Sequence, residues 1–318
     1  MQTKYPKFFN RKIPIGFVIA ALFVIAAFVY SLGYKIAMDK FNNVVSYTQE
    51  KQKMYSALSE IDYNIRKEYI AEINEVSLIS GLCKGYTNGL DDENCKFLSK
   101  KEYDDYSKSK GGIASDVEYN ELNDDLGYIR CRNLGNNASN FFIDGLNSAS
   151  SEGINKLIID LRNSNGGDVN EAFKILQHLM PSGDIVSTVD KNKNKNVVCK
   201  SSSPGVSAKM IVLINDETSG AAEIIASALK DRGDVKIVGA ETAGNAVREK
   251  IINLSDDSVL IFPDAYYVTK SGDIIFKKGI KPTDSFDLSN NLKNLLDKNE
   301  LPHDKDTQLQ EAIRLINS

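Results

Sequence analysis

The feature that most constrains the fold is an alternation of short apolar runs with helical patterns, which begins at Leu126. The expected strands are Leu126–Cys131, Lys156–Arg162, Lys209–Asn215, Asp234–Gly239, Glu249–Asn253 and Val259–Pro263. The expected helices are Asn137–Glu152, Asp168–Met180 and Ala221–Lys230, and a polar connection rich in Lys and Asn follows the second of them. Strands that alternate with helices predict an α/β domain with a mainly parallel sheet. We place this domain at residues 113–288.

A run of 22 residues without a charge, from Ile13 to Tyr34, differs from the rest of the chain, and a transmembrane anchor, a buried core helix and a cleaved signal peptide are its alternatives. As a helix it would extend about 33 Å, which is enough to cross the hydrocarbon core of a bilayer. A core helix of this length usually has a polar face, and the apolar region of a signal peptide is usually only about 7–15 residues long. We therefore expect an uncleaved transmembrane anchor at residues 13–34.

The residues before this run, 1–12, include four basic side chains and no acidic one: Lys4, Lys7, Arg11 and Lys12. Basic residues beside an apolar span favour the cytoplasmic side of a membrane. The sequence therefore predicts a short cytoplasmic tail, a single membrane pass and an extracytoplasmic remainder.

Residues 35–112 are expected to form a helical stalk and cap. Apolar residues recur there every three to seven positions between Lys, Glu and Gln: Ile36, Phe41, Val44, Tyr47, Met54, Leu58, Ile61, Ile65 and Ile70. From Gly81 to Gly112 the stretch is polar and is expected to consist largely of turns. Residues 289–318 are expected to be a helical tail, because the segment Asp306–Ile316 is amphipathic.

Composition excludes several functional classes. The formal net charge is −4, which gives no global basic surface for a nucleic acid. The two histidines, His178 and His303, leave little material for a zinc site or a serine–histidine triad, and we expect His178 to pack on an apolar helix. We expect neither a metal nor another cofactor, and the sequence sets no oligomeric state.

The four cysteines are too few for a disulfide scaffold. In an oxidising exterior, pairing of Cys83 with Cys95 and of Cys131 with Cys199 is one alternative. Free buried thiols are the other, and the sequence does not decide between them.

Two loops at the carboxyl ends of expected strands carry the candidate chemistry. The first, residues 163–168, contains Gly166 and Gly167, which would let the backbone turn sharply and direct N–H groups at an anionic centre. The second, residues 216–223, joins the strand KMIVLIN to the helix IIASAL. Neither loop has a dinucleotide or phosphate-loop glycine pattern.

The order of four motifs resembles the C-terminal processing, or tail-specific, serine peptidases. The motifs are IIDLR-x-x-x-GG, VLIN-x-x-T-x-x-A-x-EI-x-A-x-AL, VG-x-x-T-x-G and Y-x-V-T-x-SG-x-x-I-x-x-x-GI-x-P. The stretch SGLCKGYTNGLDDENCKFLSKKEY is similar to the family's helical cap, and DTQLQEAIRLI is similar to its terminal helix. The resemblance covers about residues 55–316. It implies a ClpP/crotonase-type α/β fold and cleavage of polypeptides near their C-termini outside the cytoplasm.

The resemblance also implies a serine nucleophile and a lysine base, which need no histidine. The serine position, three residues before the glutamate of the second loop, is occupied here by Gly220. The lysine position, directly after T-x-G, is occupied by Asn245, whose amide is not basic. Both members of the dyad are therefore missing from this alignment, whereas Asp231 matches a family aspartate.

Ser219, next to Gly220, is the alternative nucleophile. Thr218 and Glu223 keep the family spacing on either side, which leaves no room for a one-residue gap. A one-residue shift would turn the hydroxyl by roughly 100–180°. Ser219 would also need another base, because Lys250 falls in an expected strand and an arginine such as Arg248 is no base.

Other parts of the implied site are kept. Gly166 and Gly167 match the family's oxyanion-side glycines, and the N–H of Ala221 takes the place of the donor after the nucleophile. The family's PDZ domain is expected to be absent, because only 15 residues lie between Gly111 and Gly127, whereas a domain needs at least about 50.

These features together lead to the hypothesis of an anchored pseudoprotease that binds a polypeptide substrate or protein partner. An active serine endopeptidase using Ser219 is the rival hypothesis. Acyl-CoA binding, known from relatives on the same fold, is a third and weaker one.

Overall fold

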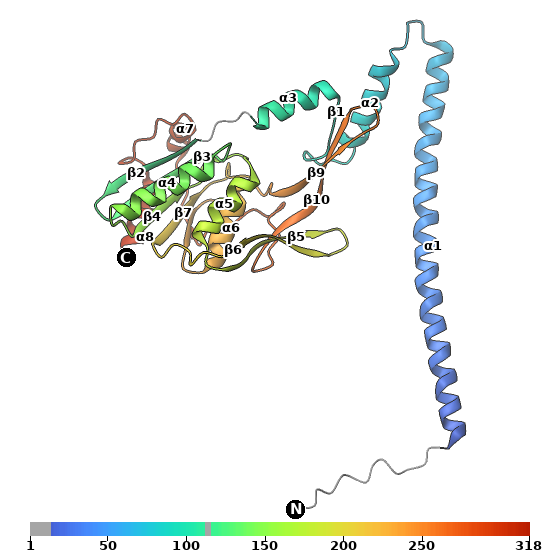
Figure 1. Ribbon diagram of the computed structural model, residues 1–318. Helices are drawn as coiled ribbons and strands as arrows, with labels where there is room; N and C mark the ends of the chain where they lie inside the picture. Colours follow the sequence, from blue (N-terminus) through green and yellow to red (C-terminus); the bar gives the residue numbers. More distant parts are fainter. Residues whose placement is uncertain (1–13, 112–115) are drawn as a thin grey trace, which may run out of the picture. The chain divides into compact units, whose positions relative to one another are not determined.

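The computed structural model describes residues 14–111 and 116–318, which form two compact units, one up to Leu78 and the other Ile79–Ser318 (Figure 1). The helices are α1 (Ile15–Glu68), α2 (Glu75–Asn88), α3 (Lys100–Gly111), α4 (Ala138–Ser151), α5 (Val169–Leu179), α6 (Ala221–Arg232), α7 (Asn290–Asp297) and α8 (Thr307–Asn317). The first unit consists mainly of α1, whose N-terminal part is apolar and long enough to cross a membrane or to act as a signal sequence. The expected cytoplasmic tail, residues 1–12, lies outside the described residues.

A six-stranded sheet forms the centre of the second unit. Its strands, in spatial order, are β11 (Asp284–Ser285), β8 (Lys236–Gly239), β7 (Lys209–Ile214), β4 (Lys156–Asp160), β3 (Leu126–Asn133) and β2 (Asp116–Asn123). Every neighbouring pair is parallel except β2 and β3. The predicted α/β domain with a mainly parallel sheet is confirmed for this part of the chain.

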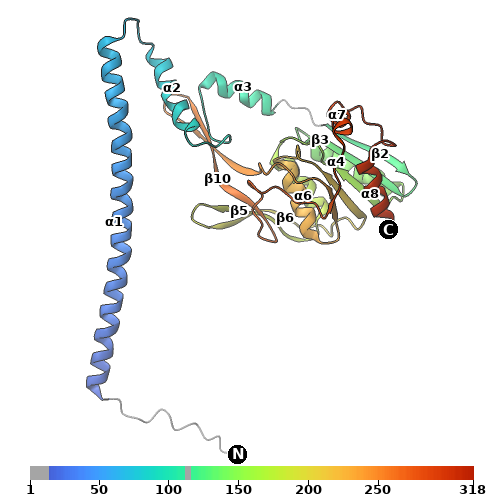
Figure 2. The ribbon, with the colours of Figure 1, turned by 180° about the vertical axis from the view of Figure 1, so that it is seen from behind.

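Helices cover both faces of this sheet, which explains why its strands are apolar at successive positions. Helices α4, α5 and α6 pack on one face and α8 on the other (Figures 1 and 2). Within β4, Ile159 belongs to the core beneath α4, α5 and α6, whereas Ile158 packs with Leu309 of α8. Each of the two cores therefore takes every second residue of a strand.

A second sheet is antiparallel; it contains the two expected strands Glu249–Asn253 and Val259–Pro263, and three strands that the sequence did not predict. Its strands are β1 (Lys96–Leu98), β10 (Val259–Thr269), β5 (Gly183–Asp190) and β6 (Lys195–Ser201), with β9 (Val247–Asn253) also paired to β10. The stretch expected to be a polar connection is the β5–β6 hairpin, and its Lys- and Asn-rich residues form the turn. Buried Ser187 and Thr188 in β5 obscured the apolar alternation that would have indicated a strand.

The expectation of turns over residues 81–112 was wrong for most of that range. Helix α2 continues to Asn88, and α3 occupies Lys100–Gly111. Strand β1 joins this cap segment to the second sheet, with Phe97 paired opposite Leu260 in β10. The predicted boundary between cap and α/β domain falls in residues 112–115, outside the described residues.

All four cysteines are free thiols. Cys95, Cys131 and Cys199 are buried, and burial raises the pKa of Cys199 to about 11. A thiol with such a pKa stays protonated at neutral pH and is a poor nucleophile.

The C-terminal tail is fastened to the central sheet by a buried ion cluster. The Arg162 guanidinium donates to Asp160 at 2.6 Å, to Asp306 at 2.7 Å and to the Gln308 side chain at 3.0 Å. Asp306 also caps α8 by accepting from the Leu309 N–H at 3.0 Å. Burial is the largest single influence on the pKa of Asp160 and raises it, but the charge and hydrogen bonds of Arg162, the charge of Arg130 and the Tyr128 hydroxyl together lower that pKa below its ordinary value. The tail is therefore held by charge pairing as well as by the apolar face of α8.

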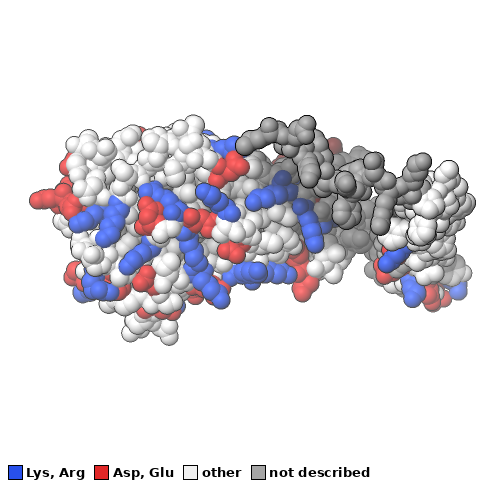
Figure 3. All heavy atoms as spheres, turned by 90° about the horizontal axis from the view of Figure 1, so that it is seen from below, with Lys and Arg blue, Asp and Glu red and all other residues white. Residues whose placement is uncertain are grey.

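The surface charges are mixed. On the face shown in Figure 3, Lys and Arg are interspersed with Asp and Glu rather than gathered into one basic area. Such mixing is typical of a solvated surface.

Candidate active site

Three loops, residues 163–168, 216–223 and 240–246, meet at one edge of the central sheet, where β4, β7 and β8 end. These strands are parallel neighbours, so their carboxyl ends lie side by side. Main-chain hydrogen bonds join the loops: the Ser219 N–H donates to the Ser164 carbonyl at 2.9 Å, and the Ala243 N–H donates to the Thr218 carbonyl at 3.1 Å. The motifs singled out in the sequence therefore form one structural unit.

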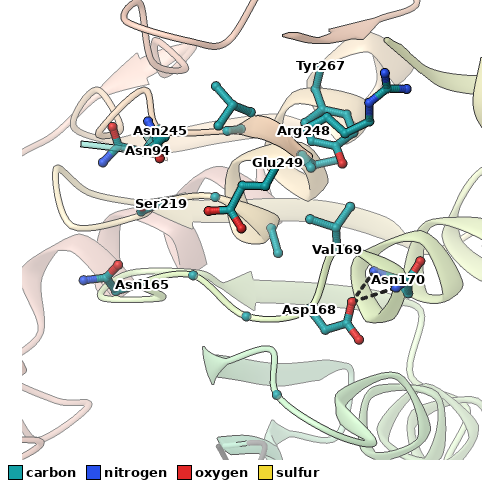
Figure 4. Close-up of a pocket in the computed structure, with 18 of the residues that line it drawn as sticks. Asn94, Asn165, Asp168, Val169, Asn170, Ser219, Asn245, Arg248, Glu249 and Tyr267 are labelled. Atoms are coloured by element: carbon teal, nitrogen blue, oxygen red, sulfur yellow. Dashed lines mark hydrogen bonds between the residues drawn. The ribbon is translucent and has the colours of Figure 1, made fainter. Parts of the chain in front are cut away.

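A pocket of about 770 Å³ lies over these loops (Figure 4). Six of the seven predicted site residues line it: Gly166, Gly167, Ser219, Gly220, Ala221 and Asn245. Asp231 does not line it; eleven residues along α6 from Gly220 correspond to about 16 Å. The Asp231 carboxylate instead accepts the Ser271 N–H at 2.8 Å. The pocket volume falls within the range of about 300–1,000 Å³ usual for ligand sites.

Residues from outside the three loops complete the pocket, and sequence reasoning missed them. Asn94, Tyr103, Tyr106 and Ser107 come from the cap segment, and Val247, Arg248, Glu249, Ile251 and Tyr267 come from the antiparallel sheet. The cap residues lie far from the motifs in the sequence, whereas the residues of β9 directly follow the third motif and Tyr267 lies within the fourth, but the motifs alone did not show that these side chains converge on one pocket. The pocket therefore needs both sheets and the cap.

The described lining residues include no lysine and no histidine. Arg248 is held by Asp264 in a two-point ion pair at 2.7 and 2.9 Å, and it points away from the pocket in Figure 4, whereas the Glu249 carboxylate points into it. Burial raises the pKa of Tyr267 to about 12, so its hydroxyl keeps its proton at neutral pH. Asp168 is engaged as the N-cap of α5, where it accepts the Asn170 N–H at 2.8 Å.

The histidines and Lys250 also lie away from the pocket lining. His178 is exposed on α5, so the prediction that it packs was wrong. His303 places its ring 5.1 Å from that of Tyr128. Lys250 is exposed in β9, as expected for a residue in a strand. Ser219, which is 8% exposed, reaches the pocket wall without a lysine or histidine among its described lining neighbours.

Gly220 keeps the backbone geometry of a strained turn between strand and helix. Its φ is 60° and its ψ is −116°, at the residue directly before α6. A strained turn of this kind exposes the nucleophile in hydrolases that carry a serine between strand and helix. A Cβ atom added here would lie 3.4 Å from the Gly166 Cα, so the site has room for a small side chain. Gly220 therefore occupies a turn that has room for a small side chain and carries none.

The main-chain N–H groups of Gly167 and Ala221 are also available at the pocket. Among the described residues, no acceptor bonds the N–H of Gly167 or of Ala221, and both residues line the pocket. Gly167 has a φ of 103°, and an added Cβ would lie 2.7 Å from the Leu134 Cβ, so no other residue fits. Unpaired N–H groups at helix N-termini, here just before α5 and at the start of α6, can bind a carbonyl or carboxylate oxygen.

The buried Glu223 carboxylate fastens the second loop to the third. One oxygen accepts the Thr242 hydroxyl and the Gly244 N–H, each at 2.6 Å. The other accepts the Gly220 N–H at 2.9 Å and the Asn245 N–H at 2.8 Å. The sequence suggested only that Glu223 favours the helix N-terminus. Its spacing three residues after Gly220, as in a capping box, indicated one of these four bonds.

The variant Glu223→Gln is expected to lower the free energy of unfolding by about 2 kcal/mol or more. In either orientation, the amide NH₂ of glutamine would face two of the four donors, and each buried donor left unpaired costs about 1–3 kcal/mol. Thermal unfolding of the full chain in detergent, followed by circular dichroism, measures the loss. Glu217→Gln, an exposed site in the same loop, is the matched control. Equal unfolding temperatures for the two variants would contradict the role of Glu223.

A family model, Peptidase family S41, matches residues 125–285, just over half of the chain. The chain belongs to peptidase family S41. The predicted relationship to the C-terminal processing peptidases is thereby confirmed. The S41 match covers every strand of the central sheet except β2, and all three loops of the pocket.

Curated relatives agree with the S41 assignment. A "Probable CtpA-like serine protease" of Staphylococcus aureus is 30% identical over 174 residues, which are 54% of this chain and 35% of that protein. A protein of the same description from Staphylococcus epidermidis is 30% identical over 169 residues, 52% of this chain and 34% of the relative. The chain thus spans about a third of the length of these relatives. A lipoprotein structure from Streptococcus agalactiae shares the fold at 17% identity, with a TM-score of 0.54, over 72% of this chain and 82% of that one.

Proposed function

We propose that this S41 family member binds polypeptides outside the cytoplasm, anchored to a membrane, without cutting them. The observation that carries the proposal is Gly220, which occupies the turn before α6 with no side chain to attack a peptide bond. The base position, Asn245, is exposed and has an amide side chain. Hydrolysis by a serine–lysine dyad needs both side chains, whereas binding does not.

Binding would use the donors that the pocket keeps. The Gly167 and Ala221 N–H groups would hold a peptide carbonyl or a terminal carboxylate. The tyrosines of the cap and Tyr267 offer apolar ring faces, and the pocket volume accommodates a few residues of an extended chain. Such a pocket retains a polypeptide after the catalytic side chains are lost.

Anchoring rests on the first part of α1. The apolar residues from Ile15 onward form a continuous helix whose side chains are exposed in the single chain, as a lipid-facing segment requires. The basic residues before it favour the cytoplasmic side. We also propose that the polypeptide reaches the pocket without a PDZ domain, because only four residues lie between α3 and β2.

Peptide hydrolysis by Ser219 is the second candidate, supported by its position on the pocket wall. Incubation of the full chain in detergent with an unfolded, reduced and alkylated protein distinguishes binding without cleavage from hydrolysis by Ser219. We expect no new fragments from wild type or from Ser219→Ala. Cleavage by wild type that disappears in Ser219→Ala would overturn the proposal of binding alone.

The binding mode has its own test. Ala221 is the first residue of α6, where proline is tolerated, so Ala221→Pro removes the N–H donor and spares the helix. Loss of one hydrogen bond to a charged or strongly polar acceptor should weaken peptide affinity about ten-fold or more. Fluorescence anisotropy with labelled peptides of unfolded substrates measures this, and Ala221→Ser, which keeps the N–H, is the control. Equal affinities for the two variants would exclude this donor from binding.

A further inference from the structure

We propose that a polypeptide binds in the pocket as an added strand along the free edge of β9. The inference deepens the proposed function and rests on it, because it takes the pocket to hold a polypeptide. It adds how that polypeptide is held: through its main chain, in an extended conformation, beside Val247–Asn253. Peptides recognised in this way obtain affinity from main-chain hydrogen bonds and selectivity from alternate side chains.

Strand β9 has a neighbouring strand on one side only. Among the described residues it pairs with β10 and with no other strand. The opposite side of β10 is taken by β1 and β5, which pair with Ile261 and Ala265, two residues that also pair with β9. The edge of β9 that faces away from β10 therefore ends the antiparallel sheet. Such an edge is a template for pairing with another extended chain.

The alternation of the β9–β10 ladder shows which main-chain groups face the free edge. The Leu254 N–H donates to the Ser258 carbonyl at 2.8 Å, so this pair is a bonded one. Bonded and non-bonded pairs alternate in an antiparallel ladder, so Ile252 also directs its N–H and C=O towards β10. The main-chain groups of residues 247, 249, 251 and 253 then point the other way, towards the free edge.

Pro263 in β10 is an independent check of this alternation. It lies opposite Glu249, and it has no N–H to donate. A proline is tolerated at a pair that exchanges no hydrogen bonds, so its place in the ladder agrees with a non-bonded pair at Glu249.

The free edge of β9 borders the pocket. Val247, Arg248 and Glu249 are consecutive residues, and all three line it. Successive side chains of a strand point to opposite faces, so a cavity over one face would touch only every second residue. A cavity lined by three residues in a row lies beside the edge. The loop from Asn165 to Asp168 lies across the same cavity in Figure 4.

The N–H donor at the start of α6 sets the direction of the added strand. The Asn245 N–H and the Gly220 N–H share one oxygen of Glu223, so β9 begins beside the turn that precedes α6. A carbonyl or carboxylate bound to the Ala221 N–H therefore lies near the first residues of β9. The part of the polypeptide that precedes this group runs towards Ile251. The added strand is thus antiparallel to β9.

A segment of polypeptide fits this edge better than the edge strand of a second folded copy. Tyr103, Tyr106 and Ser107 of the cap line the same cavity as β9, and the loop from Asn165 to Asp168 lines it as well. The edge is therefore enclosed in a cavity of about 770 Å³. A cavity of this size admits a few residues of one extended chain but not a sheet with its supporting helices.

Removing one edge donor tests the added strand. Ile251→Pro deletes an N–H that faces the free edge and spares the ladder with β10, since proline is tolerated in edge strands. Its affinity for fluorescein-labelled peptides that tile reduced and alkylated β-casein should fall about five-fold, as measured by anisotropy with the full chain in detergent. In the matched control Asn253→Pro, the lost N–H faces the same edge but lies outside the described pocket lining, so affinity should not change. Equal affinities for the two variants would overturn the proposal.

Peptides that carry single N-methyl groups give a second readout, which needs no variant of the protein. N-methylation removes one main-chain N–H of the peptide, and in an added strand only every second N–H faces β9. Moving the methyl group along the casein peptide that binds most tightly should therefore lower affinity at alternate positions, by about five-fold each. Equal effects at all positions, or no effect at any, would refute pairing with β9.

Failure of this inference and failure of the proposed function give different results. If wild type binds none of the casein peptides, the proposed function fails and this inference fails with it. If wild type binds them, but Ile251→Pro and the methylated peptides bind equally well, the pocket holds a polypeptide that does not pair with β9. Light scattering tests the other occupant: two chains per particle for wild type and one for Ile251→Pro would assign the edge to a second copy and overturn the proposal.

Discussion

Gly220→Ser combined with Asn245→Lys is expected to turn this chain into a peptidase. The turn at Gly220 already has the backbone of a nucleophile position, and the added Cβ meets the Gly166 Cα at 3.4 Å without a clash. The Gly167 and Ala221 donors remain available for a tetrahedral oxyanion. Cleavage of an unfolded protein, followed by mass spectrometry, should rise from background to at least 100-fold above it, because a paired nucleophile and base act as one unit.

The pH profile identifies the base in this double variant. Position 245 is exposed, so a lysine there is expected to stay charged at neutral pH until substrate covers it. Only the neutral amine accepts the serine proton, so activity should increase as pH rises from 7 towards 10. Gly220→Ala with Asn245→Lys has the same base without a hydroxyl and should remain inactive. Activity in that control, or none at any pH in the double variant, would contradict the account of the pocket.

Arg162→Ala is expected to cost about 3–5 kcal/mol of folding free energy, the largest loss predicted for a single substitution here. It leaves the Asp160 and Asp306 carboxylates buried without their shared cation, and breaking a buried ion pair from one side has this magnitude. The unfolding temperature of the full chain in detergent should fall by about 10 °C. Arg314→Ala removes an exposed arginine that pairs with Glu311 in α8, and it should cost less than about 1 kcal/mol.

Measuring the stability of Arg162→Ala at lower pH distinguishes the loss of charge pairing from the loss of packing. In wild type the folded pKa of Asp160 is lowered, so its contribution to stability is present above the unfolded value of about 3.9 and is lost as pH falls through the folded value. Without Arg162, burial, which is the largest influence on the Asp160 carboxylate, is expected to raise its pKa, and protonation would relieve the unpaired charge. The stability difference between Arg162→Ala and wild type should therefore shrink from pH 7 to pH 4. A difference that is independent of pH would indicate lost packing only.

Sequence alone could predict the central sheet because burial on both faces leaves a clear apolar signature. Apolar runs such as KLIIDLR and KMIVLIN predict buried strands. The loops that form the pocket follow the carboxyl ends of these strands. Those loops lie side by side because the strands before them are parallel neighbours in the sheet. The spacing of the motifs also selected Gly220 and Asn245, which line the pocket, and their correspondence to the family's dyad positions stays a prediction.

The rest depended on contacts between distant residues. Strand β5 buries Ser187 and Thr188, so its pattern looks polar although it lies in a sheet. The cap contributes Asn94 and Tyr103 to the pocket through β1, a three-residue strand too short for any periodicity. The ion cluster joins residues 144 positions apart, Arg162 and Asp306, and nothing local to either residue specifies its partner.

The four bonds of Glu223 have an evolutionary consequence for the pocket. Gly220 and Asn245 take part in them only through their main-chain N–H groups, so the framework does not depend on which side chains those positions carry. A serine at the Gly220 conformation would store strain of about 1–3 kcal/mol, which glycine releases. Substitutions at these two positions that remove catalysis would therefore leave the framework of the pocket unchanged, and they would leave the folding free energy unchanged or slightly more favourable. A receptor could arise from an enzyme here in two substitutions, with the shape of the pocket unchanged.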